Sequence, residues 1–487
     1  MKPFKFLPVA VVIALLAPTA WAQNLFVQGN TLANRFYNSD TGPTNSQLTL
    51  DFPVSQAGVL QNILTWGENS GSGGLNGVGQ SFELFVLRPL NSTNFQVVFG
   101  TGYFTVTTVG TNTFSVSSTP VGLQVGDVIA HYGRGIPFNL GTGGPSSVYV
   151  AVTMPPPVVN TTITLPSATY PLYNDGGRDY AIQVQTIGQP FLVTTNSDAG
   201  LGSLRQAVLN ANAFVGASTI NFAPNLSGQT ILLTNAAGEL LLTNNVTIDA
   251  SALAGGLSID GNGTYRVFEI ATGATNVLTG LTITNGSDPI VGDAGGIKNS
   301  GLLTVNRCQI VSNSSGYWGG GIFNGYGCTM TVNQSTISGN RAKFACGIEN
   351  QGAMTLNQCT ISGHTSSSAV AAIDNLSGTL TLNTCTVSGN SATDTIYGDP
   401  GAIWNRGIAL TLNNTTVSGN SSMTNKPPFY PGAGGIVNVS GTLNLTNSIV
   451  AGNSVGSGLD IFSSTIINLG GAGSVAADGG CIGRPRH

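Results

Sequence analysis

The stretch from Gly295 to Asn453 repeats one short pattern six times. Each repeat holds a segment like Gly-Gly-Ile-x-Asn and, further on, a segment like Ile-Ser-Gly-Asn. The isoleucines of the first segment are 25, 26, 25, 30 and 33 residues apart, at Ile297, Ile322, Ile348, Ile373, Ile403 and Ile436. A period in the mid-twenties with alternating apolar and polar positions is typical of a stacked β-solenoid. The clear repeats therefore predict parallel coils over residues 295–453.

One coil, residues 347–364, shows how the pattern would fold. It reads as three short strands separated by three bends, with Ile, Leu, Val, Cys or Met on the inner side and Thr, Ser or Asn on the outer side. A lone coil cannot bury its apolar side, so coils stack about 4.8 Å apart and pair their backbones. Like residues then form columns.

Three columns follow from this stacking. The isoleucine column and a column of small residues are predicted to lie inside, the latter being Cys308, Ser335, Cys359, Cys385, Thr415 and Ser448. An asparagine column is predicted at a bend, where each amide bonds the amides above and below it. It comprises Asn299, Asn324, Asn350, Asn375, Asn405 and Asn438. A polar binding stripe is the alternative role of that column.

The two longest steps indicate insertions, at residues 392–400 and 422–431, and a further loop at 287–294 precedes the first clear coil. All three fall at the same point of the repeat, so they should emerge from one edge of the solenoid. In repeat proteins such insertions map to one face, often the binding face. Aromatic residues gather near this edge, namely Tyr317, Trp318, Tyr397, Trp404, Phe429 and Tyr430.

Residues 1–22 read as a signal peptide. Lys2 and Lys5 precede an apolar run that is too short to span a bilayer, and Ala20-Trp21-Ala22 is a small-x-small cleavage site. We therefore expect a secreted or cell-surface chain without a transmembrane anchor. Only 7% of the residues are charged and the net charge is −4, with no basic patch, which argues against nucleic acid as a partner.

Residues 23–188 lack the repeat and read as many short strands with Gly-rich turns, which predicts a β-sandwich, jelly-roll-like. The expected strands are 47–52, 59–66, 80–87, 95–100, 104–108, 113–117, 128–131, 147–154, 161–166 and 179–186. Such domains often bind carbohydrate, but only by analogy of fold. Some aromatic and histidine side chains could stack on a ligand, although core positions are favoured. They are Trp66, Tyr103, Phe104, His131 and Tyr132.

A helix is predicted at residues 203–212, with Ser203 as its cap and an apolar face. It should cover the first coil, because an open solenoid end exposes unpaired strand edges. The solenoid should span 191–470 and a flexible tail 471–487. Less regular early coils are expected at 219–222, 229–233, 245–248, 257–259, 267–270 and 277–283.

These segments resemble a known family. The resemblance is carried by residues 192–195, 198–208, 219–222, 246–249, 278–286 and the coils that end at 446–453. They look like bacterial secreted right-handed parallel β-helix proteins, in particular those described as choice-of-anchor Q or polymorphic-outer-membrane-repeat-like. The resemblance covers about residues 191–470 and implies an all-β architecture and secretion. It implies little about activity.

Parallel β-helices also include polysaccharide lyases and hydrolases. A lyase needs clustered carboxylates for Ca²⁺ and a Lys or Arg base, and a hydrolase needs paired Asp or Glu. Glu349 and Asp374 occupy the same position in adjacent coils, with Lys298 two coils earlier, in a column expected to point into solvent. The edge loops hold acids that could bind Ca²⁺ or simply make turns, namely Asp288, Asp293, Asp394 and Asp399.

Six cysteines occur, at Cys308, Cys328, Cys346, Cys359, Cys385 and Cys481. A disulfide between the stacked Cys359 and Cys385 is geometrically possible, but small buried side chains are the default.

Two functions remain open. The first is a non-catalytic adhesive or carbohydrate-binding extracellular protein, a monomer whose partner is a polysaccharide or surface glycan. The alternative is a lyase or glycoside hydrolase of the pectate-lyase-like type. No catalytic, cofactor or metal residue is assigned, and Ca²⁺ stays possible. Ice binding through the outward threonines is disfavoured, because a single row of threonines is common on any solvated β-face. They are Thr304, Thr331, Thr355, Thr381 and Thr411.

Overall fold

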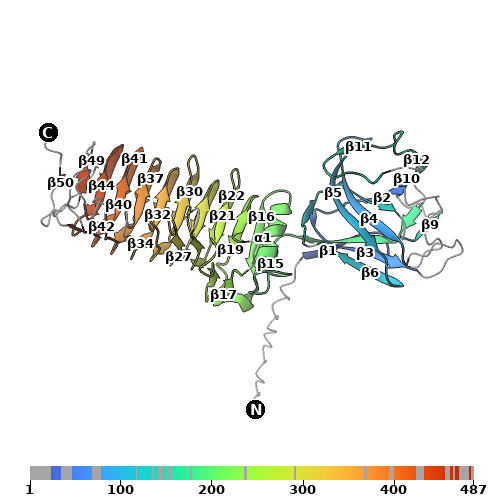
Figure 1. The fold of residues 1–487 in the computed structure, drawn as a ribbon, viewed down its shortest axis with the longest axis horizontal. Coiled ribbons are helices and arrows are strands. Elements are labelled where there is room, and N and C mark those ends of the chain that lie inside the picture. Colours follow the sequence, from blue (N-terminus) through green and yellow to red (C-terminus); the bar gives the residue numbers. More distant parts are fainter. Residues whose placement is uncertain are drawn as a thin grey trace, which may run out of the picture.

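The computed structural model has two parts, an antiparallel β region and a longer stack of parallel coils, with helix α1 (Leu204–Ala213) between them (Figure 1). The residues described are 24–33, 47–68, 78–116, 118–133, 136–140, 146–150, 155–175, 178–234, 238–289, 292–366, 370–393, 400–423, 433–455, 461–463, 467–470 and 482–483. The proposed signal peptide and most of the tail lie outside these ranges. The predicted all-β fold class is confirmed: the strands of the first part are antiparallel and those of the coils are parallel.

Two antiparallel sheets form the first part as a half-barrel. The five-stranded sheet contains β1 (Asn24–Gly29), β14 (Ile182–Gly188), β3 (Gly58–Gly67), β6 (Gly110–Ser115) and β7 (Val121–Leu123). The seven-stranded sheet runs β11 (Thr162–Thr164), β5 (Asn94–Thr105), β4 (Ser81–Pro89), β8 (Val128–Gly133), β2 (Gln47–Pro53), β10 (Ser147–Val150) and β12 (Leu172–Asp175). A separate pair joins β13 (Arg178–Tyr180) to β9 (Phe138–Leu140).

The central strand β4 is buried on both faces. Phe82, Leu84 and Val86 enter the core between the two sheets, whereas Phe85 and Leu87 enter a second core on the other face. This double burial explains why four successive residues of β4, 84–87, are all apolar. The prediction of separate strands at 95–100 and 104–108 was wrong, because β5 runs without a break from Asn94 to Thr105. Its pairing with β4 shifts register there, so the intervening glycines form a bulge rather than a turn.

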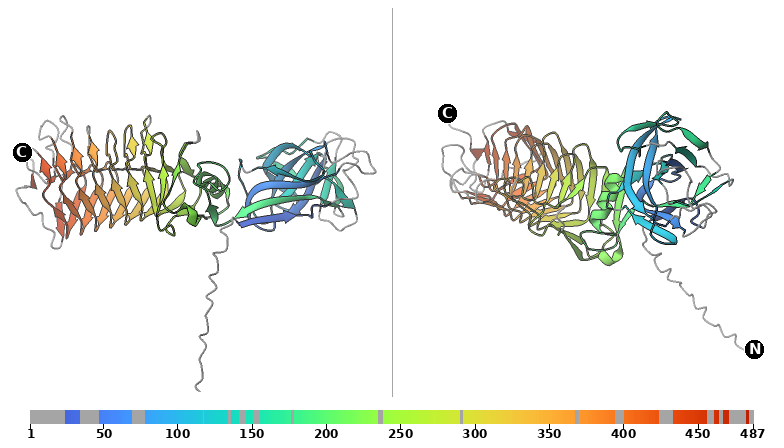
Figure 2. Two further views of the ribbon diagram at one scale, coloured as in Figure 1. Left: turned by 90° about the horizontal axis from the view of Figure 1, so that it is seen from below. Right: turned by 45° about the vertical axis from the view of Figure 1, so that its right-hand side comes forward.

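Three parallel sheets form the coils among the described residues, and Figure 2 shows their strands stacked along one axis. The eleven-stranded sheet contains β15 (Phe191–Val193), β16 (Ser218–Phe222), β19 (Val246–Asp249), β22 (Thr275–Thr279), β26 (Leu302–Asn306), β30 (Thr329–Asn333), β33 (Ala353–Asn357), β37 (Thr379–Asn383), β41 (Ala409–Asn413), β45 (Thr442–Thr446) and β49 (Ile467–Gly470).

The nine-stranded sheet contains β17 (Gln229–Leu232), β20 (Leu257–Asp260), β23 (Leu281–Thr284), β27 (Gln309–Val311), β31 (Thr336–Ser338), β34 (Thr360–Ser362), β38 (Thr386–Ser388), β42 (Thr416–Ser418) and β46 (Ile449–Val450). The ten-stranded sheet contains β18 (Leu240–Leu242), β21 (Phe268–Ile270), β25 (Ile297–Asn299), β29 (Ile322–Asn324), β32 (Ile348–Asn350), β36 (Ile373–Asn375), β40 (Ile403–Asn405), β44 (Ile436–Asn438), β48 (Ile461–Ser463) and β50 (Ile482–Gly483).

The predicted columns are confirmed. Each isoleucine of the repeat pairs with the next along the ten-stranded sheet, and all six are fully buried. The small-residue column is also buried. Each asparagine of the ladder donates from its Nδ2 to the Oδ1 of the next, over 2.6 to 2.8 Å. These amides are buried, so the predicted structural role of the column is confirmed and the alternative, a polar binding stripe, is wrong.

Helix α1 lies against the first coil (Figure 1). The Ser203 Oγ accepts a hydrogen bond from the backbone N–H of Gln206, as the sequence predicts for a cap. Leu204 and Val208 of α1 are buried and belong to the apolar core that runs through the coils. Within the described ranges, no helix is both long enough and apolar enough to cross a bilayer.

Candidate functional site

The insertions emerge from one corner, between the nine-stranded and ten-stranded sheets. There β24 (Ser287–Asp288) pairs with β28 (Ser314–Ser315), and a small sheet joins later coils. That sheet contains β35 (Thr365–Ser366), β39 (Ser391–Ala392), β43 (Ser421–Ser422) and β47 (Ser454–Val455). We call this corner the insertion edge. Several residues expected on it lie outside the described ranges, namely Asp394, Tyr397, Asp399, Phe429 and Tyr430.

An ion-pair network occupies the early coils of the insertion edge. Arg266 contacts Glu269 at 2.5 Å and Asp288 at 2.6 Å, and its Nε donates to the Ala294 carbonyl. Lys298 lies 3.7 Å from Glu269 and 3.5 Å from Asp293. The loop acids Asp288 and Asp293 are therefore held by cations rather than facing one another. In the described part of the chain, no three His, Cys, Asp or Glu side chains are grouped to hold a metal ion.

An aromatic cluster lies beside this network. The Tyr317 ring meets Trp318 edge-on at 4.5 Å and Phe344 at 5.0 Å between centroids. Lys343 Nζ sits 5.2 Å from the Tyr317 centroid, a cation–π contact. Backbone bridges align Asp293, Trp318 and Phe344 in successive coils. Tyr317 is 40% exposed, so the cluster presents an aromatic surface to solvent.

The column of the ten-stranded sheet that contains Glu269 and Lys298 also contains a buried pair of carboxylates. Glu269, Lys298, Phe323, Glu349, Asp374 and Trp404 occupy this column in register. The expectation that Glu349 and Asp374 point into solvent was wrong, since they are 0% and 2% exposed. Gly319, which follows Trp318, lies against Glu349. A Cβ on Gly319 would lie 3.2 Å from the Glu349 Cβ, which shows how close this cover is.

The two carboxyls have different surroundings. Arg406 binds both oxygens of Asp374, and its guanidinium lies 4.3 Å from the centre of the Trp404 ring. Burial raises the pKa of Asp374, while Arg406 opposes that rise. Burial raises the pKa of Glu349 well above its usual range, and the neighbouring Asp374 adds to the effect. Arg406 binds Asp374 directly, so of the two carboxyls Glu349 is the one on which burial favours a proton more.

Glu349 also carries an unsatisfied oxygen. Within the described residues its Oε2 is buried and makes no hydrogen bond, whereas its Oε1 lies 3.5 Å from Gln351 Nε2. A protonated carboxyl beside an ionised one is the arrangement that acid–base hydrolysis of glycosides uses. Because both carboxylates are buried, a substrate would reach this pair only if the residues around it moved.

The sequence-predicted aromatics of the half-barrel do not form a comparable site. His131 and Tyr132 are buried, and His131 Nδ1 lies 2.9 Å from Asp51, which is also buried. Trp66 and Phe104 are half-buried, and only Tyr103 is largely exposed, at 58%.

Sequence reasoning missed Arg266, Glu269, Phe344, Lys343 and Arg406. Glu269 could have been found, because aligning the early coil at 268–270 with 297–299 places it next to Lys298. Arg406 gave no such signal, since it lies in a turn whose length differs from coil to coil.

Comparisons with known proteins assign neither a family nor a function to this chain. No family model matches, and no curated protein matches. Among solved structures, a pectate lyase, Pel9A, has 13% identity and a TM-score of 0.36, covering 59% of this chain and 77% of its own. The catalytic domain of a GH87 alpha-1,3-glucanase in complex with tetrasaccharides has 10% identity and a TM-score of 0.24, covering 96% of this chain and 97% of its own. Both are too distant to transfer residues or chemistry.

Proposed function

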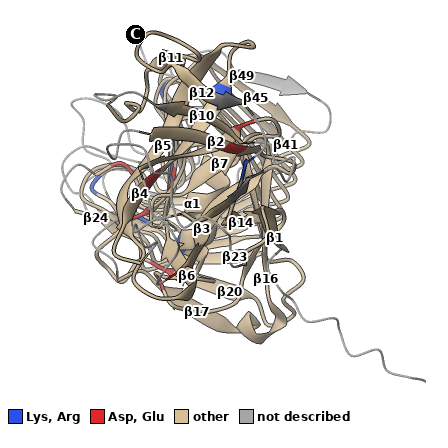
Figure 3. Ribbon diagram, turned by 90° about the vertical axis from the view of Figure 1, so that its right-hand side faces the viewer, with Lys and Arg blue, Asp and Glu red and all other residues tan. Residues whose placement is uncertain are grey.

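We propose that this chain is a secreted or cell-surface protein whose insertion edge binds a polysaccharide or cell-surface glycan without cleaving it. The observation that carries the proposal is the gathering of aromatic and charged side chains at the insertion edge. Elsewhere charges are sparse, and most of the ribbon in Figure 3 is neutral. Outward positions on the flat sheets are mainly threonine, serine and asparagine.

The chemistry of the edge suits sugars. An exposed tyrosine ring offers an apolar face on which a pyranose can pack, and its hydroxyl can bond sugar hydroxyls. The neighbouring ion pairs supply both donors and acceptors, as sugar hydroxyls require. Secretion is supported by the predicted signal peptide, and adhesion would follow if the bound glycan belongs to a cell surface.

Binding of a polysaccharide panel to the full mature chain tests this. We expect Tyr317→Ala to weaken binding by at least about fivefold, because it removes the aromatic surface. Tyr103→Ala is the matched control, since Tyr103 is an exposed tyrosine on the half-barrel. If Tyr103→Ala loses binding and Tyr317→Ala keeps it, the half-barrel is the binding module and the proposal fails.

A second candidate function is glycoside hydrolysis at Glu349 and Asp374. The unequal surroundings of the two carboxyls favour it: Glu349 would protonate the leaving oxygen, and Asp374 would act as nucleophile or base. New reducing ends would reveal hydrolysis. Unsaturated products that require Ca²⁺ would instead indicate a lyase.

Glu349→Gln separates catalysis from folding. If Glu349 is the acid, turnover falls by about 10²- to 10⁴-fold. The free energy of unfolding of Glu349→Gln should not be lower than that of the native chain at pH 7. The folded-state pKa of Glu349 is raised, so its ionisation costs stability as pH increases, and glutamine cannot ionise. Absence of turnover in the native chain across the panel would remove the hydrolase candidate.

A further inference from the structure

The stretch that carries Tyr317 and Trp318 also lies against the buried Glu349 side chain. This stretch, residues 316–321, connects β28 to β29, and we call it the edge segment. Its Gly319 has a φ of +57°, and a Cβ there would come within 2.3 Å of the Ile322 carbonyl oxygen. A glycine avoids that clash, so the backbone of the edge segment can approach Glu349 closely.

Backbone hydrogen bonds to neighbouring segments hold the edge segment in place. The Trp318 N–H donates to the Gly292 carbonyl at 2.6 Å. The Gly319 N–H donates to the Phe344 carbonyl at 3.1 Å, and the Phe344 N–H donates to the Tyr317 carbonyl at 2.7 Å. Three of these residues also build the aromatic cluster, so a movement of the edge segment also moves the aromatic rings.

The surroundings of Glu349 suit a neutral carboxyl. Its side chain is fully buried, and its Oε2 has no hydrogen-bond partner among the described residues. Phe323 and Asp374 occupy the same position in the coils before and after it. The uncharged Gln351 lies 3.5 Å from Oε1. A charge on Glu349 would therefore be cut off from water and placed beside a second carboxyl, which is costly on both counts.

The charged groups nearby supply no counterion to Glu349. On the segments around it and around the edge segment they are Asp288, Asp293, Lys298, Arg341, Lys343, Asp374 and Arg406. Arg406 binds Asp374, Lys298 binds Asp293, and Lys343 lies over the Tyr317 and Phe344 rings. Burial and then Asp374 raise the pKa of Glu349 well above its ordinary 4.5, Asp293 adds a little, and Arg406 opposes the rise.

We propose that Glu349 is a pH-sensitive switch for the insertion edge: the edge segment stays closed while this carboxyl is protonated and opens when it loses its proton. In the open form water solvates the carboxylate, and its pKa returns toward the ordinary value. The closed form is thus favoured most below about pH 4.5, and opening becomes about tenfold easier per pH unit until the raised pKa is passed. Weaker sugar binding at Tyr317 in the open form is a consequence that rests on the proposed function.

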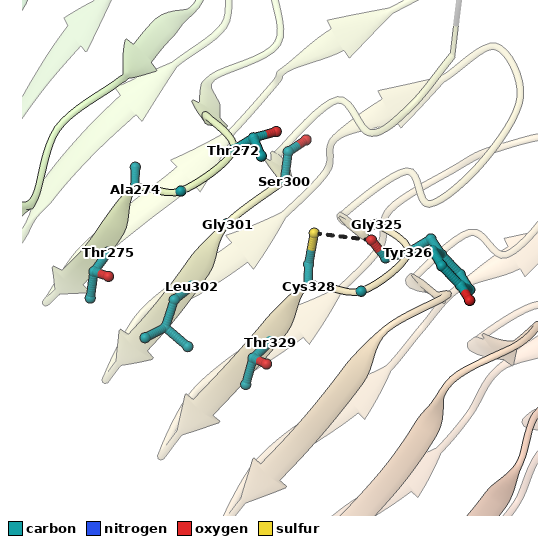
Figure 4. Close-up of a pocket in the computed structure, with 12 residues that line it drawn as sticks. Thr272, Ala274, Thr275, Ser300, Gly301, Leu302, Gly325, Tyr326, Cys328 and Thr329 are labelled. Carbon is teal, nitrogen blue, oxygen red and sulfur yellow. Dashed lines mark hydrogen bonds between the residues drawn. The ribbon is translucent and has the colours of Figure 1, made fainter.

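Amide hydrogen exchange of the full mature chain, compared with Glu349→Gln at each pH, tests the switch. Glutamine has nearly the shape of a protonated glutamate and cannot ionise, and comparison at one pH cancels the intrinsic pH dependence of exchange. We expect the ratio of exchange rates in the edge segment, native over Glu349→Gln, to rise at least tenfold between pH 5 and pH 8. Residues 325–333 follow β29 in the same coil and are the internal reference, where the ratio should stay constant. Figure 4 shows Tyr326, Cys328 and Thr329 in that stretch.

A second variant removes the neighbouring charge instead. In Asp374→Asn the guanidinium of Arg406 is released to pair with Glu349, so the ratio of native to Asp374→Asn should also rise with pH, by a smaller factor. Glu269→Gln is the matched control, because Glu269 lies in the same column but is already paired with Arg266 and Lys298. It should keep the pH dependence of the native chain.

A ratio in the edge segment that does not change with pH would overturn the proposal, and so would an equal rise in residues 325–333. Loss of the pH dependence in Glu269→Gln would place the switch in the ion-pair network rather than at Glu349, and would also overturn it. These rates are measured without any sugar, so the result does not depend on whether the insertion edge binds a glycan.

Discussion

At the scale of single residues, His364 occupies a place that asparagine fills in the neighbouring coils. A second buried ladder runs through Asn313, Asn340, His364, Asn390, Asn420 and Asn453. The backbone N–H of Asn340 donates to His364 Nδ1 at 3.1 Å, so the proton lies on Nε2 and is donated to the Ile337 carbonyl. The ring is neutral in this arrangement, and burial lowers the pKa of His364 to about 4.

Acid should therefore destabilise the native chain through His364. The unfolded pKa is near 6.5 and the folded pKa is lower, so stability is retained above about pH 6.5 and lost as pH falls toward 4. The full effect amounts to roughly 3 kcal/mol. We expect His364→Asn to be the more stable chain at pH 4.5, with a smaller difference at pH 7. Urea midpoints at both pH values measure this, and parallel pH dependence of the two chains would contradict it.

The carboxylate pair shows what residue-level prediction can reach. The repeat placed Glu349 and Asp374 in adjacent coils correctly, because alternation and period fix which side chains share a column. The prediction that these two side chains point into solvent was wrong. Alternation tells which face of a strand a side chain takes, but not whether another segment folds over that face. Gly319, which lies against Glu349, belongs to an irregular stretch between β28 and β29 that no periodicity encodes.

At the scale of elements, the buried asparagine ladder ties neighbouring coils together. Asn350 Nδ2 donates to Asn375 Oδ1 at 2.7 Å and to the Gly352 and Thr379 carbonyls, while its Oδ1 accepts from Asn324. An outward ladder of similar amide spacing, 2.8 to 2.9 Å, runs through Asn306, Asn333, Asn357, Asn383 and Asn413. Of these two ladders, only the one that contains Asn350 is buried.

Removing an amide from each ladder should have unequal effects. Asn350→Ala leaves buried partners without hydrogen bonds, each of which costs about 1–3 kcal/mol, so we expect a loss of at least about 2 kcal/mol. Asn357→Ala is the matched control, and we expect less than about 1 kcal/mol because water replaces the lost bonds. Urea unfolding monitored by far-ultraviolet circular dichroism provides both values. Equal losses would mean that the buried ladder is no more important than the surface one.

Turns limited the prediction of elements more than strands did. The early coils and the repeat were found because their apolar residues keep a strict spacing. The turns between the ten-stranded and eleven-stranded sheets differ in length, and these lengths can be counted only once the strands are aligned. In the half-barrel, Gly100 and Gly102 lie where one predicted strand ended before the next, whereas β5 continues through a bulge there.

At the scale of the whole molecule, two residues of the half-barrel reach the apolar core of the coils. Val59 of β3 and Ile187 of β14 belong to the same buried cluster as helix α1 and the coils. Gly122 of β7 lies directly against α1, and a Cβ there would come within 1.9 Å of the Ala213 carbonyl oxygen. The sequence predicted a β-sandwich over residues 23–188 and a solenoid over 191–470, and could not foresee this contact because it joins segments without any shared periodicity.

Gly122→Val should therefore loosen the junction while leaving the distant coils unchanged. The added side chain cannot fit against the Ala213 carbonyl, so α1 must shift from β7. We expect amide hydrogen exchange in residues 204–213 to become at least tenfold faster, and exchange in the coils at 320–390 to stay the same, because coils contact only their neighbours. Thr113→Val, an exposed and nearly isosteric change on β6 of the same sheet, should alter neither region. Unchanged exchange in α1 of Gly122→Val would show that the half-barrel does not hold the helix in place, and that α1 covers the first coil unaided.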